Sequence, residues 1–334
     1  MPLVRFEDMK AEFERVLIKK GCEAEIAELS ARIIAETSLD GVYSHGVNRF
    51  PRVVDYIDKG YIKLNAKPSK VDGIGAFERW DANLGLGNVT AKLTMDRAIE
   101  LARSNGIGCV ALRNANHWLR GGSYGLQAAD AGCIGICWTN TQPNMPAWGA
   151  KDRRIGNNPF VVAIPRAEGH VIIDAAMSQF SYGHMEGAKL RGEQLSVPGG
   201  YDEAGAISTD PGEISKTWRV LPIGFWKGSA LSIVLDLAAT VLSGGRSTFR
   251  VGQLGGDEYE LCQVLIAIDA KSIAGEEFLS KAVNEVLEDI KGSEPVDERQ
   301  AVRFPGEKGP RLRKQNLEQG IPVDDGVWAK ITSL

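Results

Sequence analysis

A histidine and two arginines lie close together in the string VYSHGVNRFPR, which spans Val42–Arg52. His45 could transfer a proton, because an imidazole titrates near neutral pH. Arg49 lies four residues further on, and a guanidinium holds a carboxylate with two hydrogen bonds. These residue types suit a small 2-oxo acid: Arg49 would hold its carboxylate while His45 protonates the neighbouring carbonyl oxygen. On this string alone, a capping histidine beside two surface arginines, Arg49 and Arg52, is the simpler interpretation.

A second polar group follows a predicted strand over 107–112, in the string RNANHWLRGGSYG. Asn116 and His117 would lie at the carboxyl end of that strand, the edge at which α/β sheets bind ligands. The loop therefore predicts a site, with an ordinary polar loop as the alternative. His170 and His184 have no such neighbours and are interpreted, on spacing alone, as bystanders.

Two further strings could bind an anion. Trp226 and Lys227 begin a predicted helix in the string GFWKGS, and Gly306-Glu307-Lys308 precedes another. The amino end of a helix attracts negative charge, more so with a lysine beside it. A dinucleotide fingerprint is nevertheless absent: Gly85-Leu86-Gly87 precedes a helix but has Thr90 where the third glycine is needed. The sequence also contains no Walker motif.

The elements that must position these residues can be predicted from apolar spacing. Asn88 is expected to begin a helix as its N-cap, and Gly106 to end it. Helices are predicted over 6–20, 23–38, 47–59, 88–105, from 226 to Gly244, and over about 275–291. Strands are predicted over 107–112, 134–138, 160–164, 171–174 and 261–268, and residues 192–222 are expected to be an irregular surface excursion.

Composition narrows the class of protein. The 334 residues carry a net charge of −4, which argues against nucleic-acid binding. The short basic stretch Arg311–Lys314 is expected to be a solvated helix face. The first ten residues contain no apolar segment of the kind found in signal peptides. The apolar run Leu231–Leu242 looks too short and too polar to cross a bilayer. We therefore expect a cytoplasmic protein with no membrane partner.

The five cysteines also favour a reducing compartment, because an odd number in a long chain does not indicate a disulfide framework. Cys133 and Cys137 have no second Cys or His pair nearby. They are interpreted as buried small apolar residues, and no metal is expected.

Several strings in fixed order, from about residue 6 to Leu334, together resemble the malate/L-lactate dehydrogenase family of non-Rossmann type. They are SHGVNRFPR, VALRNANHW, RGGSYG, GICWTN, Trp148–Lys151, Asn157–Pro159, FSYG and GFWKGS. The resemblance implies reduction of a 2-oxo acid, or oxidation of a 2-hydroxy acid, with NAD(H) or NADP(H). It also implies a homodimer whose active site lies close to the subunit interface. The stretch His184–Arg191 and the Gly306–Lys308 turn depart from the family strings, so substrate and cofactor preference stay open.

The resemblance assigns site residues. It makes His45 the proton donor, and Arg49, Asn116 and His117 are our candidates for binding the substrate. The cofactor contacts that it implies are His170, Val171, Ile172, Ile173, Asp174, Ala175, Ala176, Trp226, Lys227, Gly306, Glu307 and Lys308. NADH is expected over NADPH, because an acidic residue such as Asp174 near the adenosine ribose would repel a 2′-phosphate.

The predicted fold class is α/β, with a mixed α+β sheet in a non-Rossmann cofactor domain and a helical domain built from both chain ends. Residues 1–72 and about 275–334 would form the helical domain, and residues 73–274 the cofactor domain. Alternative substrates are malate, lactate, sulfolactate, ureidoglycolate or a cyclic imine acid. An alternative outside enzymes is a catalytically silent ligand-binding protein, although such a protein would not need a proton donor at His45.

Overall fold

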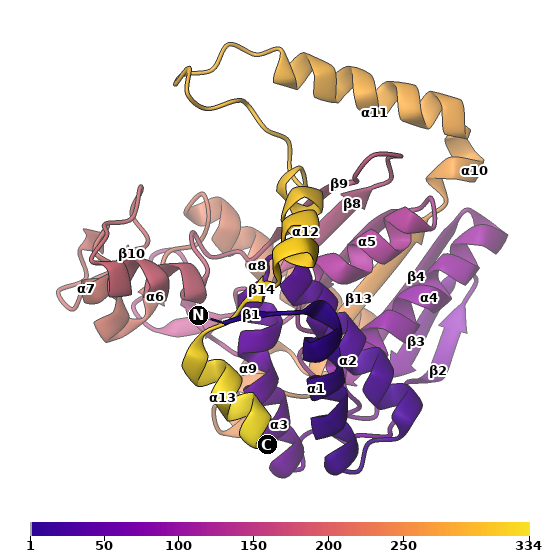
Figure 1. Ribbon diagram of the computed structural model, residues 1–334, viewed down its shortest axis with the longest axis horizontal. Coiled ribbons are helices and arrows are strands. Elements are labelled where there is room, and N and C mark those ends of the chain that lie inside the picture. The colour runs from indigo at the N-terminus through magenta and orange to yellow at the C-terminus, as the bar shows by residue number, and fades with distance from the viewer. Residues whose placement is uncertain (1) are drawn as a thin grey trace.

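The computed structural model describes residues 2–334 and contains a seven-stranded mixed sheet beside a helical lobe (Figure 1). The sheet has the order β2-β3-β4-β13-β5-β8-β9, in which β3 and β4 are parallel and all other neighbours antiparallel. This arrangement confirms the predicted α/β class. The strands are β2 (Ser69–Ile74), β3 (Phe77–Asp81), β4 (Ile107–Ala115), β5 (Ile134–Thr139), β8 (Phe160–Ile164), β9 (Val171–Ala175) and β13 (Leu261–Ile268).

The central strand β13 comes late in the chain but pairs with β4 on one side and β5 on the other. Its sequence, LCQVLIAI, is apolar nearly throughout, because helices cover it on both faces. The edge strand β2 has the sequence SKVDGI and is exposed along its whole length. Sequence spacing misses β2 and β3, since neither has the apolar alternation of a half-buried strand.

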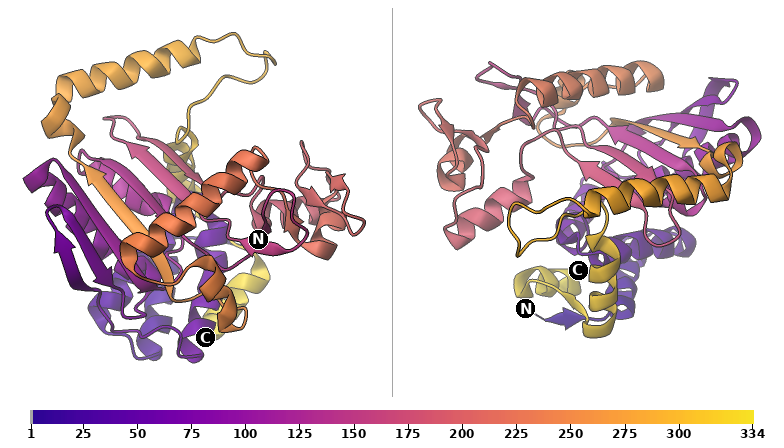
Figure 2. Two further views of the ribbon diagram at one scale, coloured as in Figure 1. Left: turned by 180° about the vertical axis from the view of Figure 1, so that it is seen from behind. Right: turned by 90° about the horizontal axis from the view of Figure 1, so that it is seen from above.

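Helices cover the two faces of the sheet (Figure 2). On one face lie α4 (Gly87–Asn105) and α5 (Gly122–Asp130), which share a buried cluster with Val110, Val161 and Leu265. On the other face lies α8 (Trp226–Ser243), where Leu235 and Ala239 pack against Val264. Because successive residues of a strand point to opposite faces, Val264 and Leu265 pack against different helices.

The helical lobe is built from both ends of the chain. Its elements are β1 (Leu3–Val4), α1 (Phe6–Lys19), α2 (Ala24–Leu39), η1 (Tyr43–His45), η2 (Val47–Arg49), α3 (Phe50–Asp58), α12 (Lys308–Gln319), β14 (Ile321–Pro322) and α13 (Asp325–Ser333). The strands β1 and β14 pair antiparallel and tie the two ends together. Inside the lobe, the rings of Phe13 and Phe50 lie with centroids 4.3 Å apart.

Residues 182–220 form a small structured lobe rather than an irregular excursion (Figure 1). Its elements are α6 (Tyr182–Arg191), β10 (Gly200–Tyr201), β11 (Ile207–Ser208), α7 (Pro211–Thr217) and β12 (Arg219–Val220). The prediction is wrong here because strands of two residues are too short to give a period. The remaining elements are β6 (Met145–Pro146), β7 (Arg153–Ile155), α9 (Thr248–Val251) and η3 (Gly252–Leu254).

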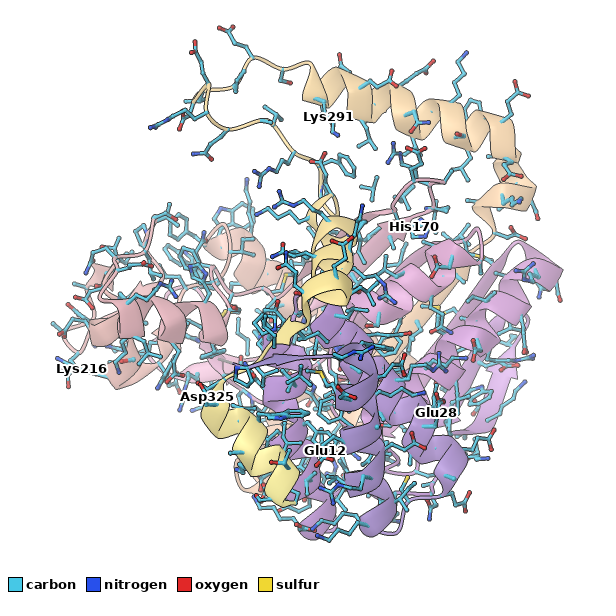
Figure 3. The ribbon with its side chains drawn as sticks, viewed as in Figure 1. Glu12, Glu28, His170, Lys216, Lys291 and Asp325 are labelled. Atoms are coloured by element: carbon cyan, nitrogen blue, oxygen red, sulfur yellow. The ribbon has the colours of Figure 1, made fainter. Side chains whose placement is uncertain are left out.

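The helices α10 (Ala270–Ala274) and α11 (Glu276–Lys291) form an arm beside β8 and β9 (Figure 1). The sequence places residues 275–291 in the helical lobe, whereas α11 lies away from α1 and α3. Two contacts hold the arm. The Arg166 guanidinium donates to Asn284 Oδ1 over 2.8 Å, and Lys291, at the far end of α11 in Figure 3, lies 2.5 Å from the Glu307 carboxylate.

Within residues 2–334, α8 alone is long and apolar enough to pass a length-and-composition test for a membrane span, and 33% of it is buried. The expectation from Leu231–Leu242 is therefore wrong on length, because the helix extends beyond that run at both ends. The same helix covers one face of the sheet, and Trp138 donates its indole N–H to the Leu235 carbonyl over 3.1 Å.

Asn88 does not cap α4, which begins one residue earlier, after Leu86. The Asn88 amide is buried and donates to the backbone carbonyl and the hydroxyl of Ser30 on α2. It thus joins the helical lobe to the sheet. Gly106 ends α4 in a left-handed conformation, as predicted. All five cysteines are free, and Cys133 and Cys137 are buried, as expected.

Candidate active site

His45 ends the short helix η1, where the chain turns between α2 and α3. Gly46 permits this turn, because a Cβ at that position would lie 2.2 Å from the Ser38 hydroxyl. The same hydroxyl accepts the backbone N–H of Val47 over 2.8 Å. The turn is therefore fastened to α2, and His45 is held on a rigid support.

The imidazole of His45 presents one nitrogen for chemistry. Its Nδ1 lies 3.0 Å from the Ser44 hydroxyl, whereas Nε2 has no hydrogen-bond partner within residues 2–334. Burial lowers the pKa of His45 to about 4, and the positive charges of Arg49 and Arg120 add to that effect. A bound carboxylate would offset these charges and favour the imidazolium. The ring is thus placed to take up a proton when an anionic substrate arrives.

His117 lies beside His45. The two residues stand in separate strings of the sequence, and the fold brings them together. The two rings have centroids 6.0 Å apart and are nearly parallel, at 22°. The Leu119 backbone N–H donates to His117 Nδ1 over 3.0 Å, which leaves the proton on Nε2. Burial and the charge of Arg49 lower the pKa of His117 well below its ordinary value. His117 is therefore a neutral hydrogen-bond donor next to His45.

The loop that carries His117 is tightly supported. Gly87 lies against it, and a Cβ there would come 2.3 Å from the His117 carbonyl oxygen. Asn114 and Leu119 have φ angles of 50° and 68°, a left-handed region that costs about 1–3 kcal/mol for such residues. Strained backbone of this kind persists only where the surroundings hold it, and it clusters at functional sites.

Asn116 is buried under this loop rather than in the open. Its amide donates to the backbone carbonyls of Tyr61, Leu84 and Gly85 at 2.9–3.1 Å. Its Oδ1 is buried and has no hydrogen-bond partner in the part of the chain that the structure describes. These contacts anchor the backbone next to His117, and the expectation that Asn116 orients the substrate stays a prediction.

Arg49 lies in η2, and only 22% of its side chain is exposed. Its guanidinium has a single long contact, 3.5 Å from Nη2 to the Glu258 carboxylate. Arg52, in α3, donates instead to the Tyr56 hydroxyl over 2.9 Å. Arg49, Arg52, Asn116 and His117 all line one small cavity. Of the two predicted arginines, Arg49 therefore keeps more of its guanidinium N–H groups available for a ligand.

Sequence reasoning missed Glu258 as a member of this site, whereas Ser44 and Arg120 stand in the two strings that it singled out. Glu258 is separated from Arg49 by most of the sheet lobe in the chain, so spacing gives no signal for it. Arg120 follows His117 in the predicted loop, and its guanidinium lies 2.5 Å from Asp40 at the end of α2. Asp40 also pairs with Arg313 on α12 over 2.8 Å. Asp40 therefore connects the His117 loop to α12.

The residues implied as cofactor contacts lie along β9. Ile172 donates its backbone N–H to the Pro305 carbonyl over 3.1 Å, which places the 305–306 turn beside the strand. Gly306 has a φ of 98°, and a Cβ there would come 2.6 Å from the His170 carbonyl. Only glycine suits that close approach. The predicted segments 170–176 and 306–308 are thus brought together, and α12 begins at Lys308.

Alternate residues of β9 face a groove between the helical lobe, α5 and the α10–α11 arm. His170, Ile172 and Asp174 line it, whereas the side chain of Ile173 points to the opposite side, as the period of a strand requires. His170, labelled in Figure 3, lies 2.8 Å from Asp130 through Nε2. The Asp174 carboxylate accepts the backbone N–H of Gly122 over 2.7 Å. Burial raises the pKa of Asp174.

The groove has a volume of about 1770 Å³ and an excess of positive charge. Nine lysine and arginine side chains line it, against six acidic ones: Arg32, Lys92, Arg103, Arg120, Arg166, Lys271, Arg303, Lys308 and Arg313, and Glu36, Asp40, Asp130, Asp174, Asp269 and Glu276. The amino end of α12 opens onto it through Lys308 and Gly309, and next to them the buried Glu307 Oε2 has no hydrogen-bond partner among residues 2–334. These features fit a dinucleotide, whose pyrophosphate needs cations and whose riboses need acceptors.

Trp226 and Lys227 do not line the groove in the single chain. Ile223, just before them in the chain, donates its backbone N–H to the Met177 carbonyl over 2.8 Å. Trp226 and Lys227 therefore lie past the carboxyl end of β9. Phe225, just before them, has a φ of 60°. Trp226 is 61% exposed. At the end of β9, Trp226 would lie near the far end of a cofactor that extends along that strand.

Comparison with known proteins identifies the family of the chain. A family model described as malate/L-lactate dehydrogenase matches residues 4–332. The chain is 50% identical over 331 residues to proteins named 2,3-diketo-L-gulonate reductase from Escherichia coli K12 and from Citrobacter koseri, covering 99% of each chain.

Solved structures agree as well. Malate dehydrogenase from Pyrococcus horikoshii OT3 has a TM-score of 0.88 at 30% identity, covering 98% of this chain and 93% of that one. Sulfolactate dehydrogenase from Methanocaldococcus jannaschii has a TM-score of 0.89 at 28% identity, covering 99% and 95%. The expected resemblance is therefore confirmed, and the chain is an oxidoreductase rather than a silent binding protein. It belongs to the malate/L-lactate dehydrogenase family.

Proposed function

We propose that the chain reduces a small 2-oxo acid with a nicotinamide cofactor, and that its substrate is 2,3-diketo-L-gulonate, which becomes 3-dehydro-L-gulonate. The observation that carries this proposal is the 50% identity over 331 residues to the reductases of that name. The charge of Arg49 near His45, together with the cationic groove along β9, supports it. Malate, lactate, sulfolactate, ureidoglycolate or cyclic imine substrates are supported less, since structures named for malate, sulfolactate and Δ1-piperideine-2-carboxylate reach only 26–30% identity.

The chemistry divides between the cofactor and the chain. A bound nicotinamide supplies a hydride to C2 of the substrate. Arg49 holds the carboxylate next to that carbon, and the Nε2–H of His117 can hydrogen-bond to the substrate. His45 gives its Nε2 proton to the oxygen at C2, so that hydride and proton together make an alcohol. The groove residues of β9 and the Gly306–Lys308 turn hold the cofactor.

An assay of NADH absorbance with a panel of 2-oxo acids tests this function. We expect turnover with 2,3-diketo-L-gulonate at the highest kcat/KM of the panel, which should include pyruvate, oxaloacetate and a sulfonated 2-oxo acid. A preference for one of the others would reassign the substrate while keeping the class. Measurable NADH binding with no turnover of any 2-oxo acid would contradict the function.

NADH should be preferred over NADPH. Asp174 faces the groove, and its carboxylate would repel a 2′-phosphate near it. Side-by-side kcat/KM values should favour NADH in the parent, and Asp174→Asn should narrow the difference. Asp130→Asn is a matched control, since Asp130 also lines the groove but pairs with His170. A parent that prefers NADPH by tenfold or more would overturn the assignment.

A homodimer formed through α8 is proposed as the assembled state. Leu231, Val234, Leu237 and Val241 make one stripe along the outer side of α8 and are 42–74% exposed. In Figure 2 that side of the helix carries no other element. Exposed apolar faces of this kind mark association surfaces. Trp226 continues the stripe toward the proposed cofactor site, so a partner on α8 would also approach that site.

The double variant Leu237→Asp, Val241→Asp should therefore shift the protein from dimer to monomer in light scattering at micromolar concentration. Val286→Asp on α11 is the matched control, because Val286 is 58% exposed and lies on a different surface. It should remain dimeric. An active parent that is monomeric at that concentration would refute the proposal.

A cytoplasmic location is also proposed. Reduced nicotinamide cofactors are supplied inside cells, and the five cysteines are all free. The acidic net charge of −4 supports the absence of a nucleic-acid partner.

A further inference from the structure

Glu258 places a buried carboxylate beside the arginine that is our candidate for holding the substrate. Only 8% of the Glu258 side chain is exposed, and its Oε2 lies 3.5 Å from Arg49 Nη2. Within residues 2–334 its carboxylate has no other hydrogen-bond or ion-pair partner. A buried carboxylate is normally satisfied by several short hydrogen bonds. Glu258 therefore retains accepting capacity that the fold does not use.

The turn that carries Glu258 is firmly attached to the helical lobe. The Glu258 backbone N–H donates to the Tyr56 hydroxyl over 3.0 Å. On one side of it, Asp257 lies 3.4 Å from Lys59, and on the other the Tyr259 ring stacks on Tyr61 with centroids 4.3 Å apart at 5°. Three consecutive residues thus contact the end of α3 and the residues just after it. The position of the Glu258 carboxylate is fixed by these contacts and not by its long pair with Arg49.

Glu258 also acts across the site. Its charge contributes to raising the pKa of Tyr182 to about 12, after the larger effect of burial. Tyr182 begins α6, and a Cβ on its neighbour Gly183 would lie 3.7 Å from Ser44 Cβ. The helical lobe and α6 therefore approach each other beside Ser44, and the charge of Glu258 reaches Tyr182 at the start of α6. A substrate carboxylate held by Arg49 would lie near Glu258, because the two side chains are in contact.

On the basis of the proposed function, we propose that Glu258 is a specificity-determining residue that selects polyhydroxylated 2-oxo acids over dicarboxylic ones. A carboxylate only accepts hydrogen bonds, and the hydroxyl groups of a sugar acid are donors that suit it. A second substrate carboxylate would instead meet a like charge in a site with little water. Arg49 would have to share its charge between Glu258 and two substrate carboxylates, and Arg52, whose charge also interacts with Glu258, already donates to Tyr56.

The test compares two substrates in one variant. Glu258→Gln keeps the size of the side chain but removes its charge, so the kcat/KM ratio of oxaloacetate to 2,3-diketo-L-gulonate should rise by about 10–100-fold. The ratio is insensitive to the fraction of folded enzyme, which affects both substrates equally. Asp257→Asn is the matched control, because it removes the neighbouring negative charge, which faces Lys59. It should leave the ratio unchanged.

A ratio that moves by less than about threefold, or that moves equally in Asp257→Asn, would overturn the role of Glu258. Should Glu258→Gln fail to fold, inhibition of the parent supplies the answer. Tartronate, with two carboxylates, should inhibit at least about tenfold more weakly than glycerate, and equal or tighter inhibition would overturn the proposal. A parent that reduces no 2-oxo acid contradicts the proposed function instead, so the two failures are distinct.

Discussion

Replacing His45 with alanine should lower kcat for reduction of the 2-oxo acid by about 10²–10⁴-fold, the usual contribution of a positioned proton donor. The Kd of NADH should stay near its parent value, because His45 lies in the helical lobe and not on β9. His184→Ala is the matched control: its ring is exposed and stacks on Phe180 with centroids 5.1 Å apart. Activity of His45→Ala within about threefold of the parent would contradict the assignment.

The same assignment predicts the pH dependence. The pKa of His45 in the free protein is lowered to about 4, so at neutral pH the imidazole is mostly neutral. Reduction needs the imidazolium, and its kcat/KM should therefore fall about tenfold for each pH unit above that pKa. Oxidation of the 2-hydroxy acid needs the neutral ring and should show no such fall. His45→Ala should remove this slope from the reduction profile.

Replacing Arg49 should raise KM for the oxo acid, strongly for lysine and more for alanine. A lysine keeps the charge but loses the two-pronged geometry of a guanidinium. Loss of a charge-assisted hydrogen bond costs about 1.5–3 kcal/mol, or roughly 10–150-fold in binding. Cofactor affinity should hardly change. Measuring KM, the Kd of NADH and the melting temperature on each variant separates substrate binding from a bracing role.

If Arg49 only braces the lobe through Glu258, Arg49→Ala would lower the melting temperature and leave KM unchanged. The substrate carboxylate would then be assigned to Arg52, Arg120 or an arginine of a partner subunit. Arg52→Ala is the control, because its guanidinium already donates to Tyr56. Arg120 is already paired with Asp40. These contacts are why Arg49 is preferred over both.

Much of the sheet could be predicted from the sequence, because its inner strands are buried and apolar. The strands at 160–164 and 261–268 agree to the residue. The edge strand β2 could not, since SKVDGI contacts water along its length and has no period. Asn88 has the residue type of a cap, but its burial against Ser30 depends on how α2 and α4 pack, which local spacing does not encode.

The residues of the site also divide into those that the sequence indicates and those that it does not. His45 and His117 each stand in a recognisable string, and the resemblance to a family joined them. Glu258 could not be found, because its contact with Arg49 depends on the Tyr56 and Tyr61 contacts that fix its turn. The sequence places α11 among the helices of the lobe, because the amphipathic pattern of a helix shows that it has an apolar face and does not show which surface that face contacts.

The pairing of β1 with β14 has a consequence for biosynthesis. During translation, the segment that carries His45 leaves the ribosome long before residues 308–333, so its lobe lacks α12 and α13 for that time. Until then the incomplete lobe exposes apolar surface, for example around Phe13 and Ile34, which are fully buried in the folded protein. Nascent chains in this condition are exposed to aggregation and are substrates for chaperones. Catalytic competence should therefore appear only after residues 308–333 have left the ribosome, however early the sheet forms.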